Sequence, residues 1–395
     1  MRRHVGLDTA VIAAGCAAVG CLLFAYVRRR RSVRKVAVVR AVTGCVRAVY
    51  GDARPVPVRG RAALPSGEST LLPETISPPT SAGFPLVLLA TELAGTTDVL
   101  ACAREVGKLL GSGGLLNLHG AVLLRGLPVR TPEDFGAFCA ALGWMPSKLG
   151  GGGTARTVLA GNIRTASDEP PEHTIEPHMD MAHNPTYPSK IGFMMLHGPP
   201  AGCGGETVLV DMRLVTRDMK ALGLDRHFAS RGGVLYRKKL WSAERASHSF
   251  TWQRRFFAPS RQEVDAQLTR GGFNDIKWGD DESVSYTNTL PVMTTHPETQ
   301  EPLWFNGVHT NHRDYFDLAP HIDTRDGSPF DTCYADGGEI GAETLAQVRA
   351  SMWGRAVAVT LQTGDIVIVD NLLAAHGRLG WTPGVPRMML LNHFE

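Results

Sequence analysis

The sequence lacks the cysteine patterns of disulfide-rich and zinc-ribbon proteins. Its 395 residues include seven cysteines, an odd number without the paired spacing of a structural metal site. Two of them fall inside an apolar run near the N-terminus. This usage excludes a disulfide framework and fits a reducing compartment. The cysteines are Cys16, Cys21, Cys45, Cys102, Cys139, Cys203 and Cys333.

Signatures of nucleotide and nucleic-acid binding are also missing. Gly150–Gly153 form a glycine run, but no Lys-Ser/Thr pair follows it, so it is not a phosphate-binding loop. No recognisable nucleic-acid-binding module accompanies the basic residues, and the chain contains no internal repeat. Nucleic acid is therefore not expected as a partner, and nothing in the sequence indicates an oligomeric state.

Acidic residues are scarce at the N-terminus. Residues 1–50 hold ten basic residues and one acidic residue, which leaves 31 basic and 37 acidic residues in the rest of the chain. Residues 9–27 are a 19-residue uncharged, mostly apolar run that predicts a transmembrane helix. An arginine block, Arg28–Arg31, follows it, so the positive-inside rule predicts a membrane anchor with a cytosolic catalytic domain. A mitochondrial transit peptide is the alternative, because such peptides are also Arg-rich and acid-poor.

The predicted domain organisation has three parts. Residues 1–47 form the basic N-terminal segment with its candidate membrane helix. Residues 48–83 are rich in Pro, Ser and Gly and predict a flexible linker. Residues 84–395 form the catalytic domain, in which helices are predicted at 98–110 and after the capping residue Thr131.

Two histidines and one carboxylate predict a metal centre. His178 and Asp180 are two residues apart, so in an extended strand their side chains point the same way. Together with His376 they form a 2-His-1-carboxylate set, which suits Fe(II) and leaves three coordination positions open. A 2-oxo acid can chelate through two of these positions, and O2 can take the third.

The His-x-Asp pattern occurs three times, because His312–Asp314 and His321–Asp323 have the same form. Between Asp314 and His376 the sequence predicts mainly loops and a helix near 342–352, which is too few strands for a barrel. Between Asp180 and His376 more strands are predicted. This larger number favours His178 and Asp180 as the metal ligands. The predicted strands are 191–196, 207–210, 233–236, 357–361 and 366–369.

A cation is expected beside His376. A buried strand is predicted at 366–369, and His376 follows it. The Gly- and Pro-rich stretch 377–386 then turns the chain back into a last strand at 388–391. This return brings Arg387 next to His376. A guanidinium there can form a paired, charge-assisted contact with a carboxylate.

Several motifs occur in order along the chain. They are Glu176–Asn184, Tyr187–Lys190, Gly204–Thr207, Asp370-Asn371, His376-Gly377-Arg378 and Arg387. As an ordered set they resemble the taurine dioxygenase-like superfamily of Fe(II)/2-oxoglutarate oxygenases, and within it the clavaminate synthase-like branch. The strand-like stretch Gly120–Gly126 extends the resemblance, which covers residues 84–395.

The resemblance implies an α+β, mainly β fold with a double-stranded β-helix (jelly-roll) core and flanking helices. It implies that His178, Asp180 and His376 hold Fe(II), and that Thr207 and Arg387 bind the distal carboxylate of the cosubstrate 2-oxoglutarate. The implied reaction uses O2 to hydroxylate, or otherwise oxidise, a C–H bond of a small organic metabolite, with release of succinate and CO2.

Two positions narrow this expectation. Taurine enzymes place a second Arg four residues after the cosubstrate Arg to hold the substrate sulfonate, and this chain has Leu391 there, so taurine is not the expected substrate. Related halogenases replace the ligand carboxylate with a small residue, and Asp180 therefore argues against halogenation.

Other interpretations remain at this stage. A zinc hydrolase could use the same three ligands, although it would not explain Thr207 or Arg387. A catalytically inactive binding protein could have the same jelly roll, because a fold alone does not prove activity. The basic, aromatic segment 236–257 predicts a solvated loop, with a lid over an anionic substrate as the alternative.

Overall fold

The computed structural model describes residues 38–41, 54–58, 73–79, 83–91, 98–147, 156–244, 250–317, 324–325 and 327–395. The predicted membrane helix 9–27, the glycine run Gly150–Gly153 and the pair His321–Asp323 lie outside these residues. Within the described part of the chain, no helix has the length and apolar character needed to span a membrane.

Two sheets form the core of the molecule. The larger has eight strands in the spatial order β1 (Val38–Ala41), β4 (Leu86–Thr91), β5 (Ala121–Arg125), β18 (Ile366–Asp370), β9 (Lys190–His197), β20 (Met388–Phe394), β7 (Ile163–Thr165) and β6 (Val158–Ala160). The smaller has four, in the order β17 (Ala356–Val359), β10 (Thr207–Asp211), β19 (Ala374–Arg378) and β8 (Ile175–His178). Every neighbouring pair is antiparallel except β4 and β5.

Strand β18 explains how the sheets and helices pack. All five of its residues are buried, because both faces of the strand are covered. Val367 and Val369 pack with Leu209 of β10, between the two sheets. Ile366 and Ile368 face the other way, into a cluster that contains residues of the helices α3 (Val99–Leu110) and α5 (Pro132–Ala141). This two-sheet core with flanking helices agrees with the predicted α+β jelly roll.

The helices outside the larger sheet begin where the sequence predicts. The Asp98 side chain caps α3, accepting from the amides of Leu100 and Ala101. Thr131 and Asp134 form a reciprocal capping box at the start of α5, with Pro132 as the first helical residue. A short helix, α4 (Leu115–His119), connects α3 to β5.

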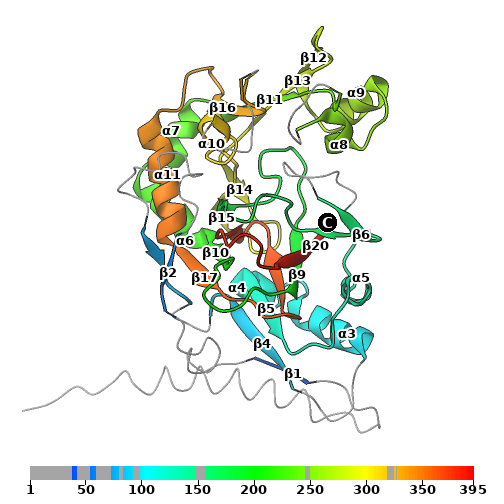
Figure 1. The fold of residues 1–395 in the computed structure, drawn as a ribbon. Helices are drawn as coiled ribbons and strands as arrows, with labels where there is room; N and C mark the ends of the chain where they lie inside the picture. Colours follow the sequence, from blue (N-terminus) through cyan, green and yellow to red (C-terminus); the bar gives the residue numbers. More distant parts are fainter. Residues whose placement is uncertain are drawn as a thin grey trace, which may run out of the picture.

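A third sheet with its own helices is inserted between β10 and β17. Its strands, in spatial order, are β12 (Asn274–Trp278), β13 (Val284–Leu290), β11 (Val234–Leu240) and β16 (Phe330–Tyr334), and its helices are α8 (Trp252–Phe256), α9 (Arg261–Arg270) and α10 (Arg313–Asp317). This unit, called here the insert, lies at the opposite end of the molecule from β1, β4 and α3 (Figure 1).

The predicted solvated loop at 236–257 is wrong for the described residues of that segment. Residues 236–240 belong to β11, whose buried and exposed positions alternate, and Trp252 begins α8. Phe250 and Trp252 are 5% and 7% exposed. Their rings join the apolar cluster of the insert, because burying large aromatic surfaces offsets the cost of ordering a basic segment.

The remaining elements cover the smaller sheet. They are α6 (Met212–Ala221), α7 (Leu224–Ser230), α11 (Ala342–Gly354), the ribbon β14 (Met293–Thr295) and β15 (Pro302–Trp304), and the ribbon β2 (Val56–Pro57) and β3 (Thr75–Ile76). Parts of the predicted linker are therefore packed. Val58 and Ile76 are buried in the core, and the Ser77 carbonyl accepts a 3.0 Å hydrogen bond from the Ala358 amide. Strand β1 likewise extends the sheet into the predicted N-terminal segment.

Candidate metal and cosubstrate site

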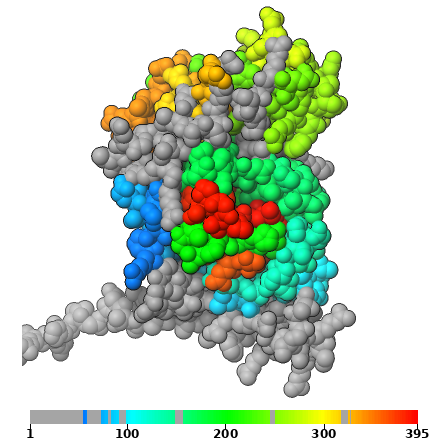
Figure 2. Space-filling model, viewed as in Figure 1, coloured from blue at the N-terminus to red at the C-terminus, as the bar shows by residue number. Residues whose placement is uncertain are grey.

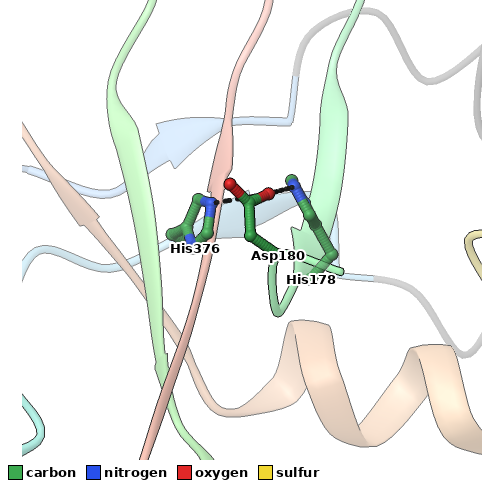
Figure 3. A group of neighbouring side chains, drawn as sticks. All are labelled: His178, Asp180 and His376. Carbon is green, nitrogen blue, oxygen red and sulfur yellow. Dashed lines mark ion pairs between the residues drawn. The ribbon is translucent and has the colours of Figure 1, made fainter. Parts of the chain in front are cut away.

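Three side chains predicted as ligands come together where β8 and β19 meet. His178 ends β8 and lies directly opposite His376 of β19 in the antiparallel ladder. The Oδ1 atom of Asp180 lies 3.3 Å from Nε2 of His178 and 3.7 Å from Nε2 of His376, between the two rings (Figure 3). Within the described residues, this is the one group of at least three His, Cys, Asp or Glu side chains whose ligand atoms all lie within 4.8 Å.

Hydrogen bonds with Glu176 and Asn371 orient His178 and the backbone of Asp180. Nδ1 of His178 lies 2.8 Å from the Glu176 carbonyl, which can only accept, so Nδ1 carries the hydrogen and the Nε2 lone pair faces the centre of the group. Asn371 fixes the backbone of Asp180 on both sides. Its Oδ1 accepts from the Asp180 amide at 2.8 Å, and its Nδ2 donates to the Asp180 carbonyl at 2.9 Å.

The ionisation of the group suits a metal ion. Burial alone would raise the pKa of Asp180, but Arg156, His178 and His393 outweigh it and hold this pKa well below its usual range. Burial, reinforced by the neighbouring His178, lowers the pKa of His376 to about 3. At neutral pH the group therefore offers a carboxylate and a neutral imidazole, the forms that bind metals.

Two residues that the sequence reasoning missed hold the second oxygen of the carboxylate. Arg156, just before β6, donates from Nη2 to Oδ2 of Asp180 at 3.2 Å. His393 of β20 approaches the same oxygen to 2.7 Å through Nε2. Both side chains are almost fully buried. The Oδ2 atom of Asp180 is therefore already hydrogen-bonded, and Oδ1 is left to face the two histidines and a metal.

A cavity of about 280 Å³ opens beside the group and contains the predicted cosubstrate residues. His178, His376, Thr207 and Arg387 all line it. Its wall includes Met388, which is 36% exposed. Figure 2 shows C-terminal residues, in red, reaching the surface at the middle of one face, flanked by green and blue-green segments.

Thr207 and Arg387 have the properties of a carboxylate site. Oγ1 of Thr207 is buried and has no hydrogen-bond partner among the described residues. Burial, followed by the nearby Arg378, lowers the pKa of Arg387 to about 9. A carboxylate would accept from the hydroxyl and compensate the buried guanidinium. The residues present therefore fit the distal end of 2-oxoglutarate.

The position of Arg387 depends on a glycine. Its Nε donates to the Gly205 carbonyl at 2.9 Å, and its guanidinium lies 5.3 Å from the centre of the Trp381 ring. Gly205 has a φ of +81°, and a Cβ there would meet Cδ of Arg387 at 2.8 Å. The glycines before Thr207 thus allow this close approach.

A buried ion pair supports the ligand strand from behind. Glu176 of β8 is fully buried, and its carboxylate accepts from Nε of Arg349 at 3.1 Å and from Nε1 of Trp353 at 3.3 Å. Arg349 also donates to the His309 carbonyl at 2.8 Å. The helix α11 is thereby fixed to the strand that carries His178.

The alternative pair His312–Asp314 lies elsewhere, and two further residues of the ordered motifs, His183 and Arg378, have other contacts. His312 and Asp314 pair with each other at 3.3 Å and do not belong to the metal-like group. His183 is buried against Tyr236 and Phe330. Arg378 donates to the carbonyls of Pro170 and His173 at 2.8 and 2.7 Å, so it braces the loop before β8 as well as lining the cavity.

Comparisons with known proteins identify the family. Residues 111–392 match the family described as taurine catabolism dioxygenase TauD, TfdA family. A clavaminate synthase-like protein of Arabidopsis thaliana is 28% identical over 333 residues, which cover 82% of this chain and 94% of that protein. The dapdiamide synthesis protein DdaC of Enterobacter agglomerans is 26% identical over 309 residues, covering 76% and 89%.

Among solved structures, PvcB of Pseudomonas aeruginosa matches with a TM-score of 0.45 and 17% identity over 83% of this chain and 92% of that chain. The family match spans most of the chain and includes all five predicted site residues. The protein therefore belongs to the TauD/TfdA family of Fe(II)/2-oxoglutarate-dependent oxygenases and is a homologue of clavaminate synthase-like proteins.

Proposed function

We propose that this protein is a dioxygenase that hydroxylates, or otherwise oxidises a C–H bond of, a small organic metabolite. One observation carries the proposal. The two histidines of the His-Asp-His group line one cavity with the Thr207 hydroxyl, which is buried without a partner among the described residues, and with the buried guanidinium of Arg387. A zinc hydrolase would have no use for the last two groups.

In this proposal His178, Asp180 and His376 hold Fe(II), and Thr207 and Arg387 hold the distal carboxylate of 2-oxoglutarate. When bound, the iron supplies the centre at which 2-oxoglutarate and O2 yield succinate and CO2 while a C–H bond of the substrate is oxidised. The protein contributes orientation and shelter. Phe193 and Met389 line the cavity beside the ligands and restrict the access of water.

The test uses the full chain under anaerobic conditions. Adding Fe(II) and then 2-oxoglutarate should produce the weak visible metal-to-ligand charge-transfer band of a chelated 2-oxo acid. Arg387→Gln should raise the Kd for 2-oxoglutarate about 10- to 100-fold, because a charged hydrogen-bonded contact is lost, while Fe(II) affinity stays close to that of the unmodified protein. His376→Ala should abolish both.

An exposed arginine provides the control. Arg226→Gln, on the solvent side of α7, should leave the band and both affinities unchanged. If well-folded, iron-loaded protein shows no band with 2-oxoglutarate, the proposed function is wrong and an inactive binding protein becomes the better interpretation.

A further inference from the structure

Two arginines, one in the cavity wall and one on a strand beside it, have no part in the proposed cosubstrate site. Arg156 lines the cavity just before β6, and its side chain is 7% exposed. Arg164 lies on the adjacent strand β7 and is partly buried. Arg156 contacts Asp180, whereas Arg387 contacts Gly205 and Trp381. Arg156 and Arg387 thus make separate contacts in the cavity wall, and the cosubstrate accounts for Arg387 but not for Arg156.

The hydrogen bonds of Arg156 are incomplete. Its Nη2 donates to Asp180, but its Nη1 faces Nε2 of His393 at 3.3 Å. That ring nitrogen lies 2.7 Å from Oδ2 of Asp180, a carboxylate oxygen that accepts its hydrogen bond. Nε2 therefore carries a hydrogen and cannot accept from Arg156. Nε of Arg156 also has no partner among the described residues.

Arg164 places a second cation on the same face of the sheet. It lies directly opposite Leu391 of β20, so the two side chains leave the sheet on one side. Leu391 occupies the position at which taurine enzymes have their substrate-holding Arg. In this chain Arg164, on the neighbouring strand β7, supplies a cation beside that position. Nε of Arg164 is buried without a partner in the described structure, and burial followed by repulsion from Arg156 lowers its pKa.

Within the part of the chain that the structure describes, neither arginine forms an ion pair with an acidic residue of the cavity wall. Asp168 and Glu169 line the cavity as well, but Asp168 is exposed and its two oxygens accept from the hydroxyls of Thr165 and Thr157 at 2.7 and 3.3 Å. Among the described residues, Asp180 has the one carboxylate that contacts Arg156, and in the proposed function this carboxylate binds the iron. A second anion beside Arg156 would satisfy its free donors.

We propose that Arg156 binds a carboxylate of the primary substrate, with Arg164 as a supporting cation, so that the enzyme acts on small monocarboxylates. The inference rests on the proposed function and adds a substrate class to it. Because Arg156 touches the ligand Asp180, the bound carboxylate lies close to the metal position. The C–H bond that reacts is therefore within a few bonds of the carboxylate.

The experiment compares acids with their neutral counterparts on the anaerobic enzyme loaded with Fe(II) and 2-oxoglutarate. The probes are N-acetyl-valine, N-acetyl-leucine and N-acetyl-phenylalanine, each as the free acid and as the primary amide. At least one acid should shift the charge-transfer band and stimulate aerobic succinate formation, at a concentration about tenfold or more below that of its amide.

Variants then test whether Arg156 and Arg164 cause the preference for acids over amides. Arg156→Gln should raise the half-saturating concentration of the best acid by about tenfold or more, and Arg164→Gln by a smaller factor, since Arg164 does not line the cavity. Both should keep the Kd for 2-oxoglutarate within about threefold of the unmodified value, unlike Arg387→Gln. Arg226→Gln should change neither quantity.

Several results would overturn the proposal. They are equal responses to acids and amides, no response to any acid, a loss of 2-oxoglutarate binding in Arg156→Gln as large as in Arg387→Gln, or a loss of Fe(II) binding in Arg156→Gln alone. The comparison of acids with amides uses the unmodified enzyme, so it tests the proposal even if a variant fails to fold. In each case an intact charge-transfer band in the unmodified enzyme leaves the proposed function standing.

Discussion

Thr207 keeps a buried hydroxyl without a hydrogen-bond partner among the described residues, an arrangement that costs stability unless a ligand uses it. Thr207→Val removes the hydroxyl with almost no change in shape on strand β10. We expect the free energy of unfolding of the ligand-free protein to stay within about 1 kcal/mol, or to rise slightly. The Kd for 2-oxoglutarate should rise about tenfold, from the loss of about 1.5 kcal/mol for a hydrogen bond to a charged group.

Equilibrium denaturation and titration of the charge-transfer band measure the two quantities separately. Thr207→Ser, which keeps the hydroxyl, serves as the control for binding. If Thr207→Val bound 2-oxoglutarate as tightly as the unmodified protein, the hydroxyl would have no part in the cosubstrate site.

The site residues differ in whether a short stretch of sequence is enough to identify them. His178, Asp180, Thr207, His376 and Arg387 each sit in a short motif or beside a predicted strand, and the sequence predicted that they share a site. Arg156 and His393 carry no such motif, and only the order of strands in the folded sheet brings them to Asp180. His393 did have a weak signal. It lies two residues after Leu391, so both point to the same face of β20.

The helix α11 and the strand β8 are joined by Arg349 and Glu176, both almost fully buried. Arg349→Met should destabilise the protein by about 3–5 kcal/mol, because it leaves a carboxylate buried without its cation. Burial already raises the pKa of Glu176, against the lowering effect of Arg349. Without Arg349 this pKa rises further, so the loss of stability should be greater at pH 8 than at pH 6. Urea denaturation at both pH values measures it.

The same helix offers a matched control. Arg355 directly follows α11 and pairs with Asp218 at 2.8 Å, but its side chain is 45% exposed. Arg355→Met should cost less than about 1 kcal/mol. If the two variants lowered the free energy of unfolding equally, burial would not be the reason why the Arg349–Glu176 pair stabilises the protein.

Elements were predictable where one local pattern dominates. The apolar runs of β9, β10 and β18 and the capped helices α3 and α5 were all predicted within a few residues. Of the insert, only the start of β11 was predicted, because its strands alternate buried and polar positions and its fold depends on aromatic side chains contributed by several separate elements. The exact opposition of His178 and His376 also had no local signal, since a ladder register is set by the partner strand.

The whole molecule should be sensitive to acid through its buried histidines. Burial, followed by Arg349, lowers the pKa of His309 to about 3, and His376 has a similar value. Between pH 6.5 and about 3 the unfolded chain binds protons that the folded chain does not, so stability falls as the pH falls through this window. Each such histidine should remove about 1 kcal/mol between pH 7.5 and 5.5.

Urea denaturation of the metal-free protein at these two pH values tests the effect. His309→Gln, which cannot titrate but can still donate to the Pro177 carbonyl, should show a pH difference smaller by about 1 kcal/mol. An unchanged difference would mean that His309 is protonated in the folded protein.

The arrangement of the larger sheet also bears on how the protein is made. Strands β18 and β20 lie inside the sheet, yet they follow its other strands in the sequence. While the ribosome is still adding residues 366–394, β5, β9 and β7 therefore have open edges, which are prone to pair with other chains. His376 emerges in this same late stretch. The three predicted iron ligands are thus present together only after this late stretch has been made.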